Sequence, residues 1–300
     1  MISDKIAFLR SQHGMTQTEL ARHCGVSLST VKNWETGLTE PHLVHIRAIC
    51  SALKVNADFL LEHLRDAGVD TSHIAAVAGP SGTTVITVDA NGENAIVYSA
   101  GSNGEVSVDY VQQSSDALVA ADVLGLCLES PMETVTACAR LCHDAGLKVL
   151  LNDSPFVAEL PAELIEASDI LLVNEHEMAQ LLDIAEPDDD DWDGLDWSDV
   201  ARQMHDFGFN QAVITLGGDG SVVIDGDDIY RIAPVAVEAI DTTGCGDAFM
   251  GTVLAGLASG HALADSAQLA SYVSAYAATG FGAQASYGTA AQIRERFGTN

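Results

Sequence analysis

The sequence predicts a layered α/β domain with helices on both faces of its sheet, preceded by a small all-α domain. Helical periodicity and helix caps fill the first 65 residues, whereas short apolar strands alternate with helices from Val69 onward. The charge changes at the same place. Residues 1–65 hold seven of the 13 Lys and Arg but only six of the 43 Asp and Glu, in a chain of net charge −30. We therefore divide the chain into a head, residues 1–64, and a body, residues 65–300.

Composition favours a globular protein of the cytoplasm. Apolar residues make up 47% of the 300 residues, which is enough for a sizeable core. The start of the chain lacks the pattern of a signal peptide and no apolar run reaches about 18 residues, so we expect no membrane partner. The acidic body would repel nucleic acid, which leaves only the head as a candidate for binding it. The six cysteines show no metal-ligand spacing and are expected to be reduced core thiols.

Apolar spacing and caps mark the first two helices of the head. The first helix is expected to end at Gly14 and to bury an apolar stripe formed by Ile6, Phe8 and Leu9. The second begins at Thr16, whose hydroxyl can cap the backbone of Glu19 in a T-x-x-E box, and it ends at Gly25.

Three further helices complete the predicted head. Ser27 can cap a third helix, whose inward residues are Leu28, Val31 and Trp34. Pro41 is expected to open a fourth helix, and Asp58 a short fifth one. The third helix then turns four polar residues mostly outward, namely Ser29, Thr30, Lys32 and Asn33.

The segment MTQTELARHCGVSLSTVKNWETG resembles the phage-repressor-like (XRE) helix-turn-helix family, and the resemblance covers residues 3 to about 62. In that family the second helix of the motif enters the major groove of DNA and the first abuts the phosphates. The resemblance therefore implies a backbone contact from Gln17, and contacts to base edges or nearby phosphates from Ser29, Thr30, Lys32 and Asn33. Because one such head binds weakly, it also implies a homodimer on two half-sites. The alternative is a helical docking module that has lost DNA binding.

A hairpin and four buried strands are expected in the body. Asn91-Gly92 is a strong hairpin turn signal between strands at residues 85–89 and 95–98. Apolar runs predict further strands at residues 123–128, 148–151, 170–173 and 212–215.

Two other segments of the body have local signatures. Ser130-Pro131-x-Glu133 predicts a capping box with proline at the first helical position, opening a helix that Gly146 closes. We interpret residues 188–199, DDDDWDGLDWSD, as an acidic surface loop.

Two glycine-rich segments are candidates for chemistry. The first, Thr215-Leu216-Gly217-Gly218-Asp219-Gly220, follows a strand, and its glycines let backbone N–H groups approach an anion, although ordinary turns use glycine too. In the second, Gly244 and Gly246 precede an apolar helix and form a pocket of N–H donors at the positive end of its dipole. Asp247 could there take a proton from a hydroxyl group that attacks a phosphoryl group. Its alternative role is a helix cap.

The second segment, DTTGCGDAF at 241–249, resembles the DTTGAGDAF signature of the ribokinase (PfkB) family of sugar kinases. AGVDTS at 67–72, Leu128-Glu129-Ser130-Pro131, Asn174-Glu175-His176-Glu177 and Gly282-Ala283-Gln284-x-Ser286 follow in that family's order, so the resemblance covers about residues 65–290. It implies a ribokinase-like fold, truncated at its N-terminal side, and a transferase of carbohydrate metabolism. That enzyme would move a phosphoryl group from ATP to a sugar hydroxyl, with a pentose such as ribose as the expected sugar.

The resemblance also implies roles for matching residues in catalysis. Asp247 would be the catalytic base, and the anion hole would be formed by Gly244, Cys245 and Gly246, with Cys245 in place of the usual alanine. Glu129 would contact the sugar together with Asp247. Asn174 and Glu177 would organise Mg²⁺ and the ATP phosphates.

Two larger sets are implied in the same way. The ATP site would further contain Thr215, Leu216, Gly217, Gly218, Asp219, Gly220, Gly246 and Ser271. A site for a monovalent cation, K⁺, would be formed by Asp241, Thr243, Ala277, Gly280, Gly282 and Ser286.

One part of the family pattern does not occur in this sequence. Members normally begin with a strand that carries a sugar-binding Asp or Asn and then a Gly-Gly-x-x-x-Asn segment, whereas here the head stands in that place and no GGxxxN is present. Loss of early strands also predicts an uncovered sheet edge. Two hypotheses follow. The chain is an ATP-dependent sugar kinase with a DNA-binding head, or it is a transcriptional regulator whose degenerate kinase domain senses a sugar or nucleotide.

Overall fold

The computed structural model describes residues 2–12, 14–39, 49, 52, 64–65, 67–88, 94–187, 191–280 and 282–298. The chain divides into two units, residues 1–76 and 77–300. The helices expected from Pro41 and Asp58 and the turn expected at Asn91-Gly92 lie outside the described residues.

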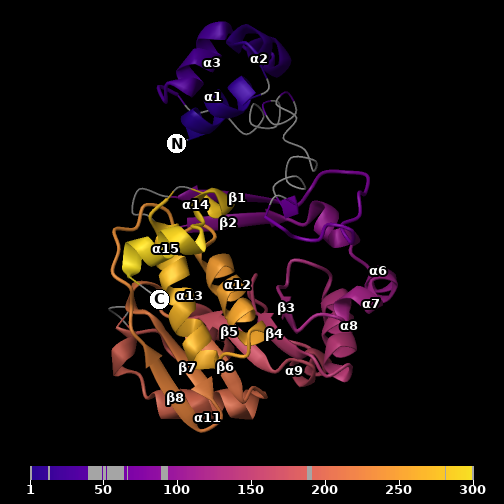
Figure 1. The fold of residues 1–300 in the computed structure, drawn as a ribbon, viewed down its shortest axis with the longest axis vertical. Helices are drawn as coiled ribbons and strands as arrows, with labels where there is room; N and C mark the ends of the chain where they lie inside the picture. Colours follow the sequence, from indigo (N-terminus) through magenta and orange to yellow (C-terminus); the bar gives the residue numbers. More distant parts are fainter. Residues whose placement is uncertain are drawn as a thin grey trace. The chain divides into compact units, whose positions relative to one another are not determined.

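Helices α1 (Ile2–Gln12), α2 (Gln17–Cys24) and α3 (Leu28–Glu35) belong to the first unit (Figure 1). The capping box predicted for α2 is confirmed, because Thr16 Oγ1 accepts the N–H of Glu19 at 3.2 Å and Glu19 Oε2 accepts the N–H of Thr16 at 2.7 Å. The buried apolar residues of this unit are Ile6, Leu20, Ala21, Cys24, Val31, Trp34 and Ile49.

Two residues predicted to lie in that core are exposed instead. Phe8 is 59% exposed whereas Ile6 is 4% exposed, because residues two apart lie roughly 200° from each other around a helix of 3.6 residues per turn. Leu28, the first residue of α3, is 38% exposed, and the buried face of that helix begins one turn later with Val31 and Trp34.

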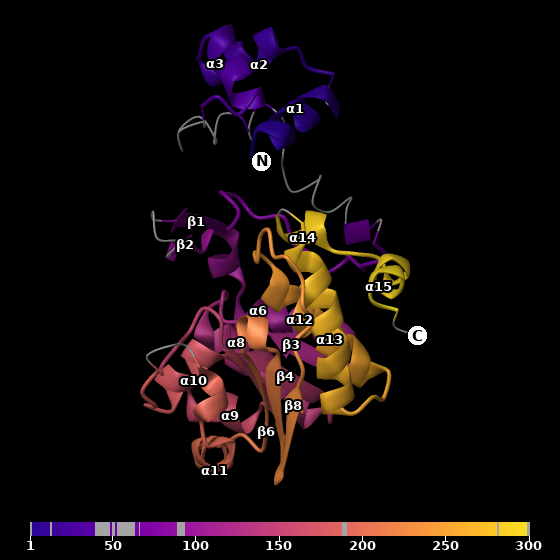
Figure 2. The same cartoon turned by 90° about the vertical axis from the view of Figure 1, so that its left-hand side faces the viewer.

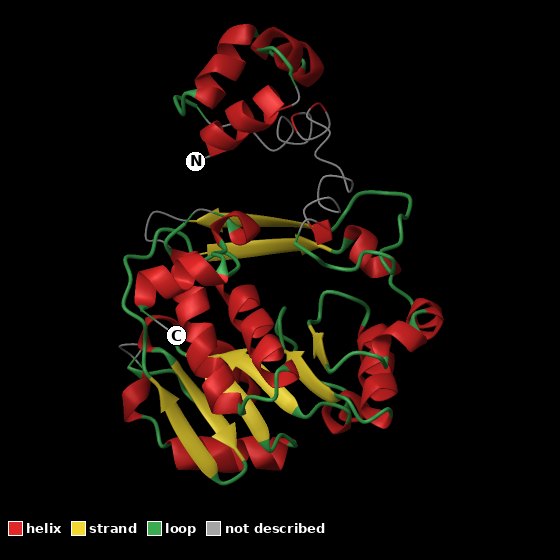
Figure 3. Ribbon diagram, viewed as in Figure 1, coloured by secondary structure: helices red, strands yellow, loops and turns green. Residues whose placement is uncertain are grey.

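The second unit is built on a six-stranded sheet with the order β3-β4-β5-β6-β7-β8 (Figures 1 and 3). The parallel strands, which the apolar runs predicted, are β3 (Val123–Leu126), β4 (Lys148–Asn152), β5 (Ile170–Asn174) and β6 (Gln211–Thr215). The sheet is mixed because two antiparallel strands follow, β7 (Ser221–Asp225) and β8 (Asp228–Ile232).

Helices cover both faces of this sheet, as predicted (Figure 2). Leu151 and Leu171 belong to the core on one face, which is covered by α8 (Met132–Asp144), α9 (Ala162–Glu166), α10 (Glu175–Leu181) and α11 (Trp197–Phe207). Leu150 and Leu172 belong to the core on the other face, under α12 (Cys245–Ala258) and α13 (Leu263–Ala278). Successive strand residues point to opposite faces, so continuous apolar strands fill both cores.

A separate two-stranded antiparallel sheet contains β1 (Thr83–Val88) and β2 (Asn94–Ser99), with Val88 opposite Asn94. The predicted hairpin strands are therefore confirmed, with slightly different bounds. Short elements fill the remaining connections: η1 (Gly101–Glu105), α6 (Val108–Gln113), α7 (Ser115–Leu118), η2 (Trp192–Gly194), η3 (Gly217–Asp219), α14 (Ala283–Ser286) and α15 (Ala290–Phe297).

Two local predictions for the body are wrong. Pro131 has ψ 134°, so it is the N-cap of α8 itself, and no side chain caps that helix. The segment 188–199 is more than a solvated loop where it is described. Trp192 is 3% exposed in the core, and the carboxylate of Asp196 caps α11 by accepting the N–H groups of Ser198 and Asp199.

Strand β3 lies at an edge of the sheet in the described part of the chain, where it pairs with β4 alone. Helix α12 packs so closely on it that a Cβ at Gly125 would stand 2.4 Å from Leu254 Cδ1.

Among the helices that the structure describes, we find no candidate for a membrane span, because none combines the necessary length with sufficient hydropathy.

Candidate functional site

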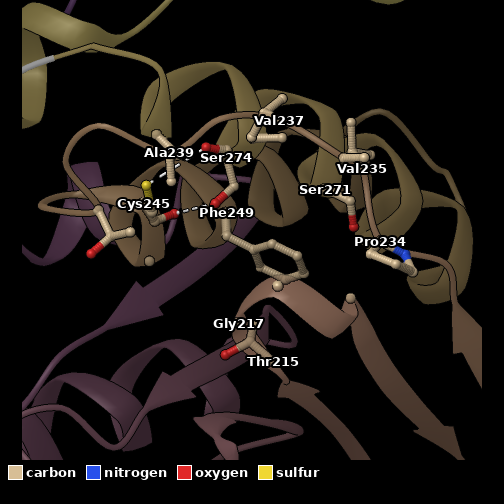
Figure 4. Close-up of a pocket in the computed structure, with 17 residues that line it drawn as sticks. Thr215, Gly217, Pro234, Val235, Val237, Ala239, Cys245, Phe249, Ser271 and Ser274 are labelled. Atoms are coloured by element: carbon tan, nitrogen blue, oxygen red, sulfur yellow. Dashed lines mark hydrogen bonds between the residues drawn. The ribbon is translucent and has the colours of Figure 1, made fainter.

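A pocket of about 520 Å³ lies in the second unit between the end of β6 and helices α12 and α13 (Figure 4). The glycine-rich turn after β6 forms one wall, residues 234–239 form another, and the two helices close the rest. The ring of Phe249 points from α12 toward the glycine-rich turn. Six of the residues predicted for the nucleotide site line this pocket, namely Thr215, Gly217, Gly218, Gly220, Gly246 and Ser271.

The other predicted nucleotide residues do not line the pocket. The side chain of Leu216 is 2% exposed and belongs to the core. Asp219 is exposed in η3, and Asn174 stands at the end of β5.

Backbone geometry explains the glycine at position 220. Gly220 has φ +92°, and a Cβ there would stand 2.2 Å from the carbonyl oxygen of Ile232 in β8. Only glycine fits such a left-handed position against a neighbouring backbone. The turn therefore passes close to the sheet and presents main-chain atoms to the pocket.

The N-terminus of α12 forms the far side of the pocket. Gly244 is its N-cap, with φ +80°. Cys245 and Ser274 tie the helix to α13, because Ser274 Oγ donates to the carbonyl oxygen of Cys245 at 3.0 Å and the Cys245 thiol donates to that of Ser274 at 3.6 Å. Of the three N–H groups predicted for the anion hole, that of Cys245 already donates to the carbonyl oxygen of Thr242 at 3.1 Å. The N–H groups of Gly244 and Gly246 at this helix end could bind an anion in a fixed position.

Asp247 follows in the first turn of α12 and is open to solvent. Partial burial nevertheless raises the pKa of its carboxyl group. The phenol of Tyr287 lies near it. Burial and then the charges of Asp247 and Cys245 raise the pKa of Tyr287. A carboxylate with a raised pKa beside an anion-binding helix end is suited to accept a proton.

Glu129 follows β3 and contacts the end of β2. The carbonyl oxygen of Glu129 accepts the hydroxyl of Tyr98 at 2.9 Å, and that hydroxyl accepts the side-chain amide of Asn103 at 3.1 Å. Burial, and then the charges of Asp247 and Glu129, raise the pKa of Cys127 to about 11. The thiol thus lies near both carboxylates, so the predicted base and sugar contact belong to one region.

Asn174 and Glu177 form a capping box at the start of α10. Asn174 Oδ1 accepts the N–H of Glu177, and Glu177 Oε2 accepts the N–H of Asn174, both at 2.8 Å. Burial raises the pKa of Glu177, and the charges of Asp153 and Glu175 add to that effect. Oxygen ligands of this kind suit Mg²⁺, which one or two carboxylates hold together with phosphates. The residues present therefore fit a Mg²⁺ site, although among the described residues no three His, Cys, Asp or Glu gather as a metal cage.

The residues predicted for K⁺ lie around the loop that precedes α12. Asp241 accepts the N–H of Thr243 at 2.9 Å and the N–H of Gly282 at 2.8 Å. A Cβ at Gly280 would stand 2.9 Å from the Cβ of Ser286. The hydrogen bond between Asp241 and Gly282 holds the loop before α12 beside the segment after α13. Backbone carbonyl oxygens of these two segments could hold a monovalent cation.

In the first unit, the predicted DNA-contacting residues lie on two helices. Ser29 and Lys32 are exposed on α3, and Thr30 and Asn33 are half-buried. The amide of Gln17 donates to Glu35 Oε2 at 2.7 Å, so in this structure it is tied to its own domain.

Glu35 also joins α1 to α3. Arg10 Nε donates to its Oε1 at 2.5 Å, and Arg10 Nη2 to its Oε2 at 2.9 Å. Burial opposes the ionised form of Glu35, but the hydrogen bonds from Arg10 and Gln17 leave its pKa below the ordinary value.

Sequence reasoning missed several residues of the site. Tyr98, Ser274 and Tyr287 have no local signal, because each acts through a partner at least 29 positions away. Asp153 had a weak signal, since it comes two positions after the strand predicted at 148–151, near the carboxyl end where functional residues of parallel sheets gather.

Two family patterns match the sequence. The pattern of the pfkB family carbohydrate kinases matches residues 51–290, and a helix-turn-helix pattern matches residues 6–60.

Individual sugar kinases are also similar to this chain. The ribokinase of Staphylococcus aureus (strain COL) is 32% identical over 232 residues, which are 77% of this chain and 74% of that protein. The deoxyribokinase of Salmonella typhi is 28% identical over 245 residues, 81% of this chain and 78% of that protein. A ribokinase from Cryptococcus neoformans var. grubii serotype A, solved in complex with ADP, has a TM-score of 0.69 and 26% identity, and the match covers 80% of this chain and 79% of that one.

Proposed function

This chain belongs to the pfkB family of carbohydrate kinases through residues 51–290, and from that premise we propose that it transfers the γ-phosphoryl group of ATP to a sugar hydroxyl. The observation that carries the proposal is Asp247, a carboxylate of raised pKa beside the N-terminus of α12 and the glycine-lined pocket. A pentose such as ribose is the first candidate acceptor, because the similar proteins include a ribokinase and a deoxyribokinase.

The chemistry requires a base and a site for negative charge. The Asp247 carboxylate takes the proton of the acceptor hydroxyl, whose oxygen then attacks the γ-phosphorus. The bond from that phosphorus to the bridging oxygen breaks, and ADP leaves. The backbone N–H groups of Gly244 and Gly246 stabilise the charge on the transferred group.

Metal ions would assist from two neighbouring positions. Asn174 and Glu177 would hold Mg²⁺, which neutralises charge on the phosphates when bound. The loop containing Asp241 would hold K⁺. The residues of this chain would keep the two substrates in place and hold Asp247 beside the acceptor.

The head adds a second activity to the proposal. Helix α3, with Lys32 exposed and Asn33 half-buried, would read duplex DNA, and two copies of the chain would bind two half-sites.

A transcriptional regulator that senses a sugar or nucleotide is the second candidate. The observation that favours it is the helix-turn-helix at 6–60, which stands where the family's sugar-binding segment is expected. Ligand binding would then change the affinity for DNA instead of leading to transfer.

An ADP-release assay separates the two candidates. It would use Mg²⁺, K⁺ and ATP against ribose, other pentoses, fructose and nucleosides, with Asp247→Asn as the control. Sugar-dependent release that disappears in Asp247→Asn supports the kinase. No release, together with a sugar- or ATP-dependent rise in melting temperature and a changed affinity for DNA, supports the regulator.

A further inference from the structure

Asp153 is a buried carboxyl group with one oxygen unsatisfied. The residue is 0% exposed. Its Oδ1 accepts the N–H of Val157 at 3.0 Å, whereas its Oδ2 has no hydrogen-bond partner. A buried polar group without a partner costs about 1–3 kcal/mol, and a charged one costs more, so such an atom marks a place where something else completes the contacts.

The position of Asp153 indicates what that partner is. Asp153 directly follows β4, and its N–H donates to the carbonyl oxygen of Leu172 in β5 at 3.2 Å. Strand β5 ends at Asn174, the N-cap of α10, so Asp153 stands beside the capping box that contains Glu177. The Glu177 carboxylate accepts the N–H of Asn174 at 2.8 Å, so it lies at the same end of β4 and β5 as Asp153. Two neighbouring carboxylates repel each other at low dielectric unless a cation lies with them.

We propose that Asp153 is a further ligand of the divalent cation, which it binds together with Glu177 while nucleotide phosphate oxygens fill the remaining positions. Mg²⁺ is commonly held in this way, by one or two carboxylates plus phosphates. The inference rests on the proposed function for its nucleotide. It adds a residue that the family resemblance did not assign.

The test is a Mn²⁺ titration followed by electron paramagnetic resonance on the full chain saturated with ADP, without any sugar. Asp153→Asn keeps the shape of the side chain and removes its charge, so Mn²⁺ affinity should fall at least tenfold. Asp169→Asn is the matched control. Asp169 stands before β5, at the other end of the strands, where its Oδ2 accepts the N–H of Val149 at 2.7 Å. This variant should bind Mn²⁺ as the wild type does, and both should bind ADP normally in EDTA.

Equal Mn²⁺ affinity in the wild type and Asp153→Asn would overturn the inference, as would a wild-type protein that binds ADP but no Mn²⁺. If Asp153→Asn fails to fold, the wild type still gives a test. Fe²⁺ bound in place of Mg²⁺, with ascorbate and peroxide, should cleave the backbone near residues 153 and 177, and cuts near 177 alone would contradict the inference. Mn²⁺ binding through Asp153 without phosphoryl transfer would contradict the proposed function and leave this inference standing.

Discussion

The hydroxyl group of Tyr287 donates a hydrogen bond to the backbone carbonyl oxygen of Gly244, at 3.0 Å. The two residues are 43 positions apart, and the bond joins the residue after α14 to the N-cap of α12. The same carbonyl oxygen accepts the N–H of Ala248 at 3.0 Å. The helix end that presents the proposed anion-binding N–H groups is thus held from outside the helix as well as from within.

Gly244→Ala should destabilise the body strongly. The new Cβ would stand 2.7 Å from the Cβ of Ala283 and 2.8 Å from the hydroxyl of Tyr287, at a residue with φ +80°. The left-handed conformation alone costs about 1–2 kcal/mol, so the free energy of unfolding in urea should fall by at least that much. Gly246→Ala is the control, because its Cβ would meet nothing within 4 Å. An equal loss in both variants would contradict this account.

Phosphoryl transfer should depend on pH through Asp247. Its pKa is raised by burial, and the base must be deprotonated to act. As pH falls, the active carboxylate is therefore lost at a higher pH than for an ordinary Asp. The quantity kcat/KM for ribose should rise with pH through this pKa and then level off. A rate that increases on acidification would remove Asp247 as the base.

Lys32→Ala should weaken binding to every duplex DNA by a similar factor. It should also lower the slope of log affinity against log salt concentration by about one. Asn33→Ala should instead change which DNA sequences the head prefers. Fluorescence anisotropy with random and selected duplexes measures both effects. Arg296→Ala removes the same charge from α15 and is the matched control. Affinity for ATP should be unaltered, and unchanged DNA binding in both head variants would exclude α3 as the reading helix.

Glu35→Gln should destabilise the head by about 3 kcal/mol, since it leaves the charge of Arg10 without an ionised partner at a site where the Glu35 side chain is 6% exposed. The pKa of Glu35 is lowered, so its stabilisation is present above the unfolded pKa of about 4.3 and is lost as pH falls through the folded value. Hydrogen exchange in α1–α3 measures the loss. Arg22→Gln, at an exposed position of α2, should have no effect, and a difference that persisted at pH 2 would contradict the ion-pair explanation.

Much of the fold could be predicted from local sequence. Continuous apolar runs predicted the four parallel strands, because burial on both faces requires apolar residues at every position. The Thr16–Glu19 box gave a helix start, since its hydrogen bonds join residues three apart. The glycine-rich turn after β6 was found because glycine is needed where backbone meets backbone, as Gly220 meets Ile232.

The sequence by itself thus determined the hairpin strands, the four parallel strands, the glycine turns and the family, all of which depend on residues near one another in the chain. Tertiary structure alone decided that Tyr287 meets Gly244, that Tyr98 meets Glu129, and that Asp153 is buried with an unpartnered oxygen. Tertiary packing also leaves Phe8 exposed to solvent, although that residue is apolar. The physical reason is that these contacts depend on how helices and strands pack across the sheet, and local periodicity carries no information about which distant side chains that packing brings together.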